Sequence, residues 1–141
     1  MTNQKGFSLI ELLIVVAIIG IIAAIAVPNL LQSKAAANEA SAISSLRNVV
    51  TSQITYSATT GSGSYASSLT VLSTQKLIDG VLGAGTKAGY NFTATGSATA
   101  FSVNADPVTP GSTGNRYFFS DESGVIRYNT AAAANASSSA L

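Results

Sequence analysis

Residues 7–27 read FSLIELLIVVAIIGIIAAIAV, and this stretch constrains what the rest of the chain can be. Every residue in it is apolar or glycine except Ser8 and Glu11. With a rise of about 1.5 Å per residue, a helix of this length is about 31 Å long, which matches the hydrocarbon thickness of a bilayer. The sequence therefore predicts one helix that can span a membrane.

Few charges flank this apolar segment. Lys5 precedes it, and Lys34 is the first positive charge that follows it. A very short basic N-terminus tends to stay on the cytoplasmic side of a membrane. We therefore expect residues 1–6 to lie inside the cell and the bulk of the chain outside the cytoplasm.

Beyond Pro28 the apolar residues recur mostly at three- and four-residue steps, which is typical of a helix with one covered face. The predicted covered stripe contains Leu31, Ala35, Ile43, Leu46, Val50 and Ile54, and the polar residues placed mostly elsewhere are Asn38, Ser41, Ser45, Asn48 and Ser52. The helix is expected to continue to about Thr55, with Pro28 accommodated by a kink. Counted from Phe7 it would be about 70 Å long, so lipid or other copies must cover its first half.

The rest of the chain predicts a small head. Residues 57–68 form a Gly/Ser loop, and residues 68–82 are expected to form one or two short helical turns. Apolar and polar residues then alternate at 90–95 and 101–106, and the segments 116–120 and 125–129 flank an acidic turn. These patterns predict an antiparallel sheet of about four strands, one face of which covers the outer half of the helix.

The fold class is therefore α+β, with a long N-terminal helix packed on a C-terminal antiparallel sheet. The expected organisation is a leader (1–6), a membrane-spanning helix (7–27), an amphipathic continuation (28–55), a head (56–130) and a tail (131–141). The tail reads AAAANASSSAL and is expected to be flexible, because it lacks large apolar residues except the last.

Composition excludes several classes of function. The chain has no cysteine and no histidine, which removes disulfides, thiolate metal sites and imidazole bases. Its basic residues are scattered singly, so it offers no patch for nucleic acid. We therefore predict that the chain is not an enzyme and that it has no cofactor and no metal site. The turn acids Asp106, Asp121 and Glu122 leave calcium as a lesser alternative.

Residues 5–30, KGFSLIELLIVVAIIGIIAAIAVPNL, resemble the leader and N-terminal helix of type IV pilins and of type II secretion pseudopilins. In that family a membrane peptidase cuts after the glycine and methylates the new N-terminus. The resemblance implies cleavage between Gly6 and Phe7, with N-methylphenylalanine at Phe7. Beyond this segment only the layout, a long helix followed by a small sheet, resembles the family.

Glu11 is the charged residue of the apolar segment. A buried acid in a membrane helix costs about 2.5 to 3.5 kcal/mol at full depth and less near the interface, so it usually has a partner. Cleavage after Gly6 would uncover an amine at Phe7. The family resemblance implies that Glu11 pairs with the N-terminus of a neighbouring subunit. The alternative is a glutamate that reaches the lipid headgroups.

Gly20 and Pro28 are the remaining candidate assembly residues. A glycine at this depth either loosens the helix or lets another backbone approach, although it can also be an ordinary small residue. Related filaments often melt the helix between these two positions, so residues 20–28 are where we expect such melting.

The resemblance implies a subunit that polymerises through its N-terminal helices into a type IV pilus, serving adhesion, motility or DNA uptake. Its precursor would be a single-pass inner-membrane protein, and its mature form would lie in the extracellular pilus. The implied partners are the prepilin peptidase and the pilus or secretion assembly machinery. The alternatives are a major pseudopilin of type II secretion, favoured by the absence of cysteine, a monomeric membrane-anchored binding module, and a secretory signal peptide cleaved after Ala26.

Overall fold

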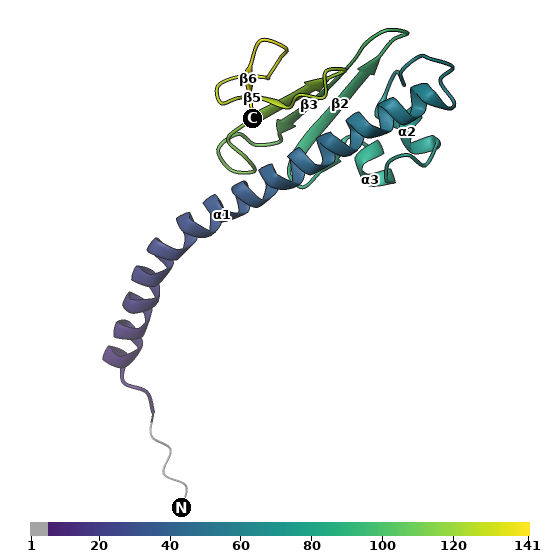
Figure 1. The fold of residues 1–141 in the computed structure, drawn as a ribbon. Helices are drawn as coiled ribbons and strands as arrows, with labels where there is room; N and C mark the ends of the chain where they lie inside the picture. The colour runs from purple at the N-terminus through teal and green to yellow at the C-terminus, as the bar shows by residue number, and fades with distance from the viewer. Residues whose placement is uncertain (1–5) are drawn as a thin grey trace, which may run out of the picture. The chain divides into compact units, whose positions relative to one another are not determined.

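The computed structural model describes residues 6–141, so most of the predicted leader lies outside the described residues. The chain divides into two units, Met1–Ser33 and Lys34–Leu141, which are described separately. One helix, α1 (Leu9–Ala58), contributes residues to both units (Figure 1). It runs through Pro28 and ends three residues beyond the predicted Thr55.

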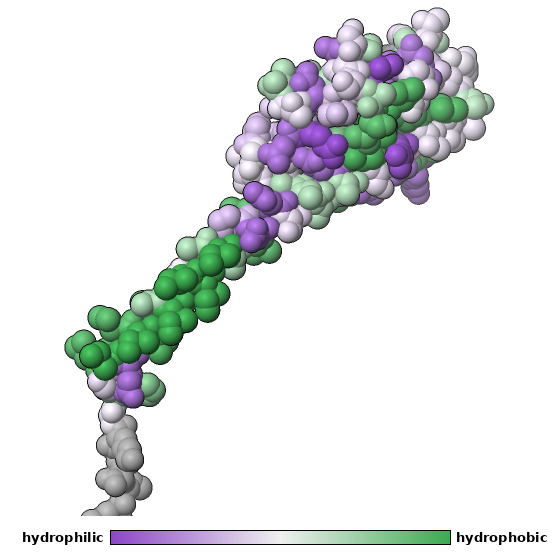
Figure 2. Space-filling view, turned by 60° about the vertical axis from the view of Figure 1, so that its left-hand side comes forward, coloured by the Kyte–Doolittle hydropathy of each residue, from purple (hydrophilic) through white to green (hydrophobic). Residues whose placement is uncertain are grey.

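Within its described residues 6–33, the first unit consists mainly of the beginning of α1. These residues are exposed throughout, and Figure 2 shows strongly hydrophobic residues gathered along this part of the helix. In length and composition α1 meets the requirements for crossing a membrane, and its most apolar stretch has no cover from the residues that the structure describes. The prediction of one apolar helix that can span a bilayer is therefore consistent with the structure.

The second unit packs the later turns of α1 beside the sheet. The buried side chains of this helix face, in chain order, are Ala35, Glu39, Ala42, Ser45, Leu46, Val49, Val50, Ser52 and Gln53. The predicted stripe was wrong at Leu31 and Ile54, which are 49% and 54% exposed, whereas Ser45 and Ser52 are buried. Ser52 is tolerated there because its hydroxyl donates to the Leu77 carbonyl at 3.0 Å.

Gln53 holds the upper part of the head to α1. Its side chain is completely buried, its Nε2 donates to the Ala66 carbonyl at 3.0 Å, and its Oε1 accepts from the Ala66 amide at 2.8 Å. A buried amide is stable only when its donor and acceptor are both used, as they are here. Hydrophobic periodicity cannot predict such a position, since it scores glutamine as polar.

The sheet has six antiparallel strands in the order β1-β2-β3-β4-β5-β6. They are β1 (Thr86–Lys87), β2 (Tyr90–Gly96), β3 (Phe101–Pro107), β4 (Tyr117–Asp121), β5 (Arg127–Asn129) and β6 (Ser139–Ala140). The four predicted strands are β2 to β5, and their alternation puts Tyr90, Phe92, Phe101 and Val103 in the core. The prediction missed β1 and β6, which are too short to show alternation.

Two short helices complete the head, as the sequence predicts. Helix α2 (Leu69–Thr74) begins after Ser68, and α3 (Gly80–Gly83) begins after Asp79. Asp79 accepts the Leu82 amide at 2.8 Å, which satisfies one of the free N–H groups at the start of α3. Leu69, Leu72 and Leu82 bury their side chains in the common core.

The last residues do not form the frayed tail that the sequence suggests. They cover the outer face of the sheet, where Phe119 lies in register with Asn104 and Arg127. Asn104 donates to the Ala134 carbonyl at 3.0 Å, and Arg127 donates to the Ser138 carbonyl at 3.1 Å. Successive strand residues face opposite sides of a sheet, so of the neighbours Phe118 and Phe119 only Phe118 enters the main core. The tail is ordered because Phe119 needs cover on the outer face.

Glu39 anchors the opposite end of the head to α1. Its Oε1 accepts the backbone amides of Asn115 at 2.7 Å and Arg116 at 3.2 Å. Its Oε2 accepts the Arg116 Nε at 2.8 Å, and the guanidinium lies over the rings of Phe118 and Tyr128. The loop before β4 is thus held to the helix by one carboxylate, which sequence analysis did not single out.

Tyr90 packs against the same loop and requires Gly114. The Tyr90 hydroxyl donates to the Arg116 carbonyl at 2.8 Å, and burial, followed by the charge of Glu39, raises the pKa of this tyrosine. A Cβ at Gly114 would overlap the Tyr90 hydroxyl. The glycine is therefore needed for close approach, since its own φ is not positive.

Replacing Glu39 with alanine should destabilise the head by about 3 kcal/mol, because two amides and a guanidinium lose their shared acceptor. Urea unfolding of the detergent-solubilised chain measures the change. Arg47→Ala, at an exposed position of the same helix, is the control and should change stability by less than about 0.5 kcal/mol. Equal effects of the two substitutions would contradict the anchoring role of Glu39.

Gly114→Ala should destabilise the head by about 1 to 3 kcal/mol, because the new methyl group displaces Tyr90 from its core position. Gly80→Ala is the matched control, since a Cβ there meets no atom within 4 Å and its φ is not positive. The melting temperatures of the two variants test the difference. A Gly114→Ala variant as stable as Gly80→Ala would show that Tyr90 does not require this space.

Candidate functional site: the N-terminal processing and assembly segment

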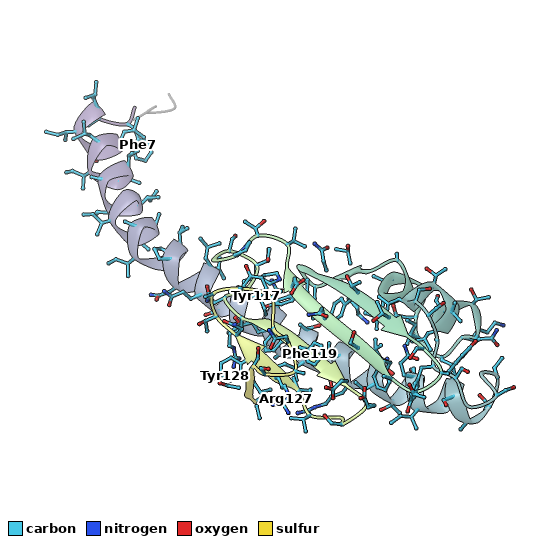
Figure 3. All side chains as sticks on the ribbon, turned by 90° about the horizontal axis from the view of Figure 1, so that it is seen from above. Phe7, Tyr117, Phe119, Arg127 and Tyr128 are labelled. Carbon is cyan, nitrogen blue, oxygen red and sulfur yellow. The ribbon has the colours of Figure 1, made fainter. Side chains whose placement is uncertain are left out.

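The predicted cleavage point lies just ahead of the helix. Gly6, Phe7 and Ser8 have no regular secondary structure, and α1 begins at Leu9. The Phe7 side chain is 88% exposed (Figure 3). Exposed backbone outside regular structure is where proteases act most readily. The bond between Gly6 and Phe7 is therefore accessible in the part of the chain that the structure describes.

Ser8 and Glu11 together cap the start of α1. The Ser8 amide donates to Glu11 Oε2 at 2.8 Å, and the Ile10 amide donates to the Ser8 hydroxyl at 3.3 Å. This reciprocal arrangement is a capping box, in which side chains satisfy amides that the helix leaves free. The Ser-x-x-Glu spacing that signals it is visible in the sequence, but our sequence analysis did not use it.

The capping box directs the Glu11 carboxylate towards the beginning of the chain. Its Oε2 accepts the amide of Ser8, the residue that follows Phe7. Cleavage after Gly6 would create a positive amine at Phe7 itself. In the single chain Glu11 makes no ion pair with a described residue. A carboxylate held in this way can exchange an amide donor for a charged one, which makes a stronger hydrogen bond.

Gly20 and Pro28 both lie inside α1. Beyond the neighbouring backbone of α1 itself, a Cβ at Gly20 would meet no atom of residues 6–141 within 4 Å, so nothing in the described part of one copy requires glycine there. Pro28 cannot donate to the preceding turn, and the neighbouring Asn29 side chain donates to the Ile25 carbonyl at 3.2 Å. Residues 20–28 are helical in the structure. Melting of this segment concerns an assembled filament and stays a prediction.

The acids of the head do not gather into a metal site. Within residues 6–141 no three Asp or Glu side chains lie close enough together to hold an ion. Asp121 accepts the Ser123 amide at 3.0 Å within its turn. Asp106 is half-buried, its Oδ1 has no hydrogen-bond partner within the described chain, and burial raises the pKa of its carboxyl group.

Comparison with known proteins places the N-terminal segment. Residues 1–27 match the family model of the prokaryotic N-terminal methylation motif. The type IV wide pilus major component PilA4 of Thermus thermophilus is 50% identical over 56 residues, which cover 40% of this chain and 43% of that protein. The type IV major pilin protein PilA of Myxococcus xanthus is 49% identical over 51 residues, 36% of this chain and 23% of the pilin.

A secretion protein matches as well. The type II secretion system core protein G of Escherichia coli is 42% identical over 44 residues, which cover 31% of this chain and 30% of that protein. The chain thus spans less than half the length of the curated relatives it matches. No solved structure shows a significant match to the chain.

The N-terminal segment is therefore that of the type IV pilin and pseudopilin family, and the resemblance inferred from residues 5–30 is confirmed. The long helix followed by an antiparallel sheet is the fold class that the sequence predicts. Pilins and a type II secretion protein share this segment, so the segment alone does not distinguish a pilin from a pseudopilin.

Asp106→Asn should stabilise the head at neutral pH by up to about 1 kcal/mol, after allowance for partial solvent exposure. A carboxyl group whose folded pKa is raised binds its proton more tightly in the native state, so native stability falls as pH rises through that pKa. The gain should vanish below the ordinary Asp pKa of 3.8, where the group is protonated in both states.

Urea unfolding of both proteins between acidic and neutral pH measures this difference. Glu122→Gln, at an exposed position, is the control and should show no comparable gain. A gain for Asp106→Asn that is independent of pH would show that burial of the charge is not its cause.

Proposed function

We propose that this chain is the structural subunit of a type IV pilus, assembled by packing of its N-terminal helices with those of identical copies. The observation that carries the proposal is the uncovered apolar surface of α1. The large apolar side chains from Phe7 to Leu31 are between 49% and 88% exposed. Covering each such side chain is worth about 1.5 to 3 kcal/mol, so the segment cannot remain in water.

Lipid and neighbouring copies can cover this surface in turn. The precursor is an inner-membrane protein with a single spanning helix, and the mature subunit lies in an extracellular pilus. The prepilin peptidase would cleave between Gly6 and Phe7 and methylate Phe7, after which the assembly machinery adds the subunit to the filament. The pilus would serve adhesion, motility or DNA uptake. The role is structural, without catalysis or a cofactor.

Glu11 supports a stepwise account of assembly. While the leader is present, its carboxylate can remain on the Ser8 amide. After cleavage the Phe7 amine of a neighbouring copy offers a charged donor, and an interfacial charge pair of this kind is worth more than an amide contact when water is excluded. Gly20 and Pro28 allow neighbouring backbones to approach and the helix to adjust.

A major pseudopilin of a type II secretion system is the second candidate. The match to core protein G and the absence of cysteine support it. Both candidates use the same processed helix, so they differ in where the filament forms. Electron microscopy of cells that express the chain from its own locus distinguishes them, since a pilus extends from the surface and a pseudopilus stays in the periplasm.

Glu11→Ala should leave membrane insertion intact and reduce filament yield by more than about tenfold, because loss of one partner of an interfacial charge pair costs about 2 to 5 kcal/mol. The measurement is the amount of subunit in sheared filaments relative to the total subunit in the cell. Filament yield equal to that of the unaltered chain would contradict the role of Glu11.

Ser8→Ala is the matched control for this substitution. It removes the hydroxyl half of the same capping box, worth about 1 kcal/mol to the helix, and keeps the carboxylate. Filaments should therefore persist in Ser8→Ala. If both variants lose filaments equally, helix capping and not the charge pair between copies explains the defect.

A further inference from the structure

One face of α1 in the head points away from the core and has no cover within residues 34–141. Its exposed side chains recur at steps of four and three residues, and we call them the outward stripe: Ala36, Ala40, Ser44, Arg47, Thr51 and Ile54. A helix that faces water usually carries several charges on its exposed side. The outward stripe carries one charge and otherwise small or apolar side chains, which allow another chain to approach closely.

The charges of the head indicate what could meet this stripe. Two ion pairs form within the described chain, Lys87 with Asp79 and Arg116 with Glu39, each at 2.8 Å. Arg47 is exposed and has no ion-pair partner within residues 6–141. Among the acids of residues 34–141, Glu122 is exposed and also has no ion-pair partner within the described chain.

Glu122 and Arg47 lie on different sides of the head. Glu122 belongs to the turn between β4 and β5, whereas Arg47 lies on the side of α1 that faces away from the core. The sheet packs beside the opposite side of the helix (Figure 1). The two charges are therefore placed to meet between copies.

Glu122 and Arg47 lie at nearby levels along the axis of α1. Asp121, next to Glu122, pairs with Ser102, and the adjacent Phe101 ring lies 4.8 Å from that of Tyr65. The residue after Tyr65 is bound by Gln53, so Glu122 lies level with the last turns of the helix. Arg47 is one to two turns lower, which corresponds to about 5 to 10 Å along the axis.

We propose that the outward stripe of each copy is covered by the head of a neighbouring copy, with Arg47 paired to the neighbour's Glu122. The contact rests on the proposed function and specifies how the heads meet in the filament. It requires parallel copies offset by one to two helical turns. Such copies keep most of their apolar segments, about 31 Å long, side by side.

Lys34, another exposed cation on α1, does not fit as well. It lies more than a dozen residues before Arg47, so pairing it with Glu122 would require an offset of about 27 Å between copies. That offset would leave little of the apolar segments in contact. In identical parallel copies, the offset that brings the charges of the heads together also sets how far the apolar segments overlap.

Cysteine crosslinking tests the contact without background, because the chain has no cysteine. Filaments of an Arg47→Cys, Glu122→Cys double variant are treated with a short bifunctional maleimide, since two cysteines are shorter than the side chains they replace. We expect a ladder of dimers, trimers and longer species on denaturing gels. Each single variant should give no species longer than a dimer.

The matched control is Lys34→Cys with Glu122→Cys, which should give no ladder. A ladder from this control that exceeds the one from Arg47→Cys with Glu122→Cys would overturn the proposed contact. Filaments of the Arg47→Cys, Glu122→Cys variant that give no ladder would also overturn the proposed contact, while leaving the proposed function intact. If the unaltered chain forms no filaments, the proposed function fails and the contact fails with it.

Charge exchange gives a second test on the same filaments. Arg47→Glu and Glu122→Arg should each lower filament yield by about tenfold, because each brings like charges together at a contact from which water is excluded. The double exchange should restore most of the yield. Single variants with normal yield, or a double variant no better than the singles, would contradict the pairing.

Discussion

The large apolar side chains of the first part of α1 have no cover within residues 6–141, and this exposure constrains everything else in the protein. Such a surface is stable only when it is kept out of water. Lipid can provide one apolar environment, and in the proposed filament copies of the same helix provide another. In that proposal Glu11 is the charge that makes the two environments unequal. In a bilayer a carboxylate is costly, whereas beside a neighbour's amine it gains a partner of opposite charge. The capping box with Ser8 holds the carboxylate at the end of the helix where that amine would appear.

The head is fixed to the second part of α1 largely by polar side chains that bind backbone. Glu39 holds the loop before β4, and Gln53 holds Ala66 at the other end. Between them Ala42, Leu46 and Val49 pack against the aromatic residues of β2 and β3. The chain has no cysteine, so the head is held to the helix without a disulfide. Anchoring at both ends keeps the outward stripe of the helix free for contact with another copy.

The elements that the sequence predicts are those whose pattern is local. An unbroken apolar run predicts the first part of α1. Alternation predicts β2 and β3, and the acidic turn between two strand-like segments predicts β4 and β5, each within a residue or two. Resemblance identified Gly6, Phe7 and Glu11, and the structure adds that Ser8 caps the same turn. The missed features depend on tertiary contacts. Glu39, Ser52 and Gln53 are polar residues whose burial follows from backbone groups distant in sequence. The tail folds because Phe119 needs cover, which the composition of residues 131–141 does not reveal.

The most direct test of the account is the N-terminal mass of the subunit recovered from isolated filaments. Proteolysis followed by mass spectrometry identifies the first residue and any methyl group on it. The account predicts that the recovered chain begins at Phe7 and carries a methylated amine. A recovered chain that begins at any other residue, or one found only as a monomer in the membrane, would contradict it.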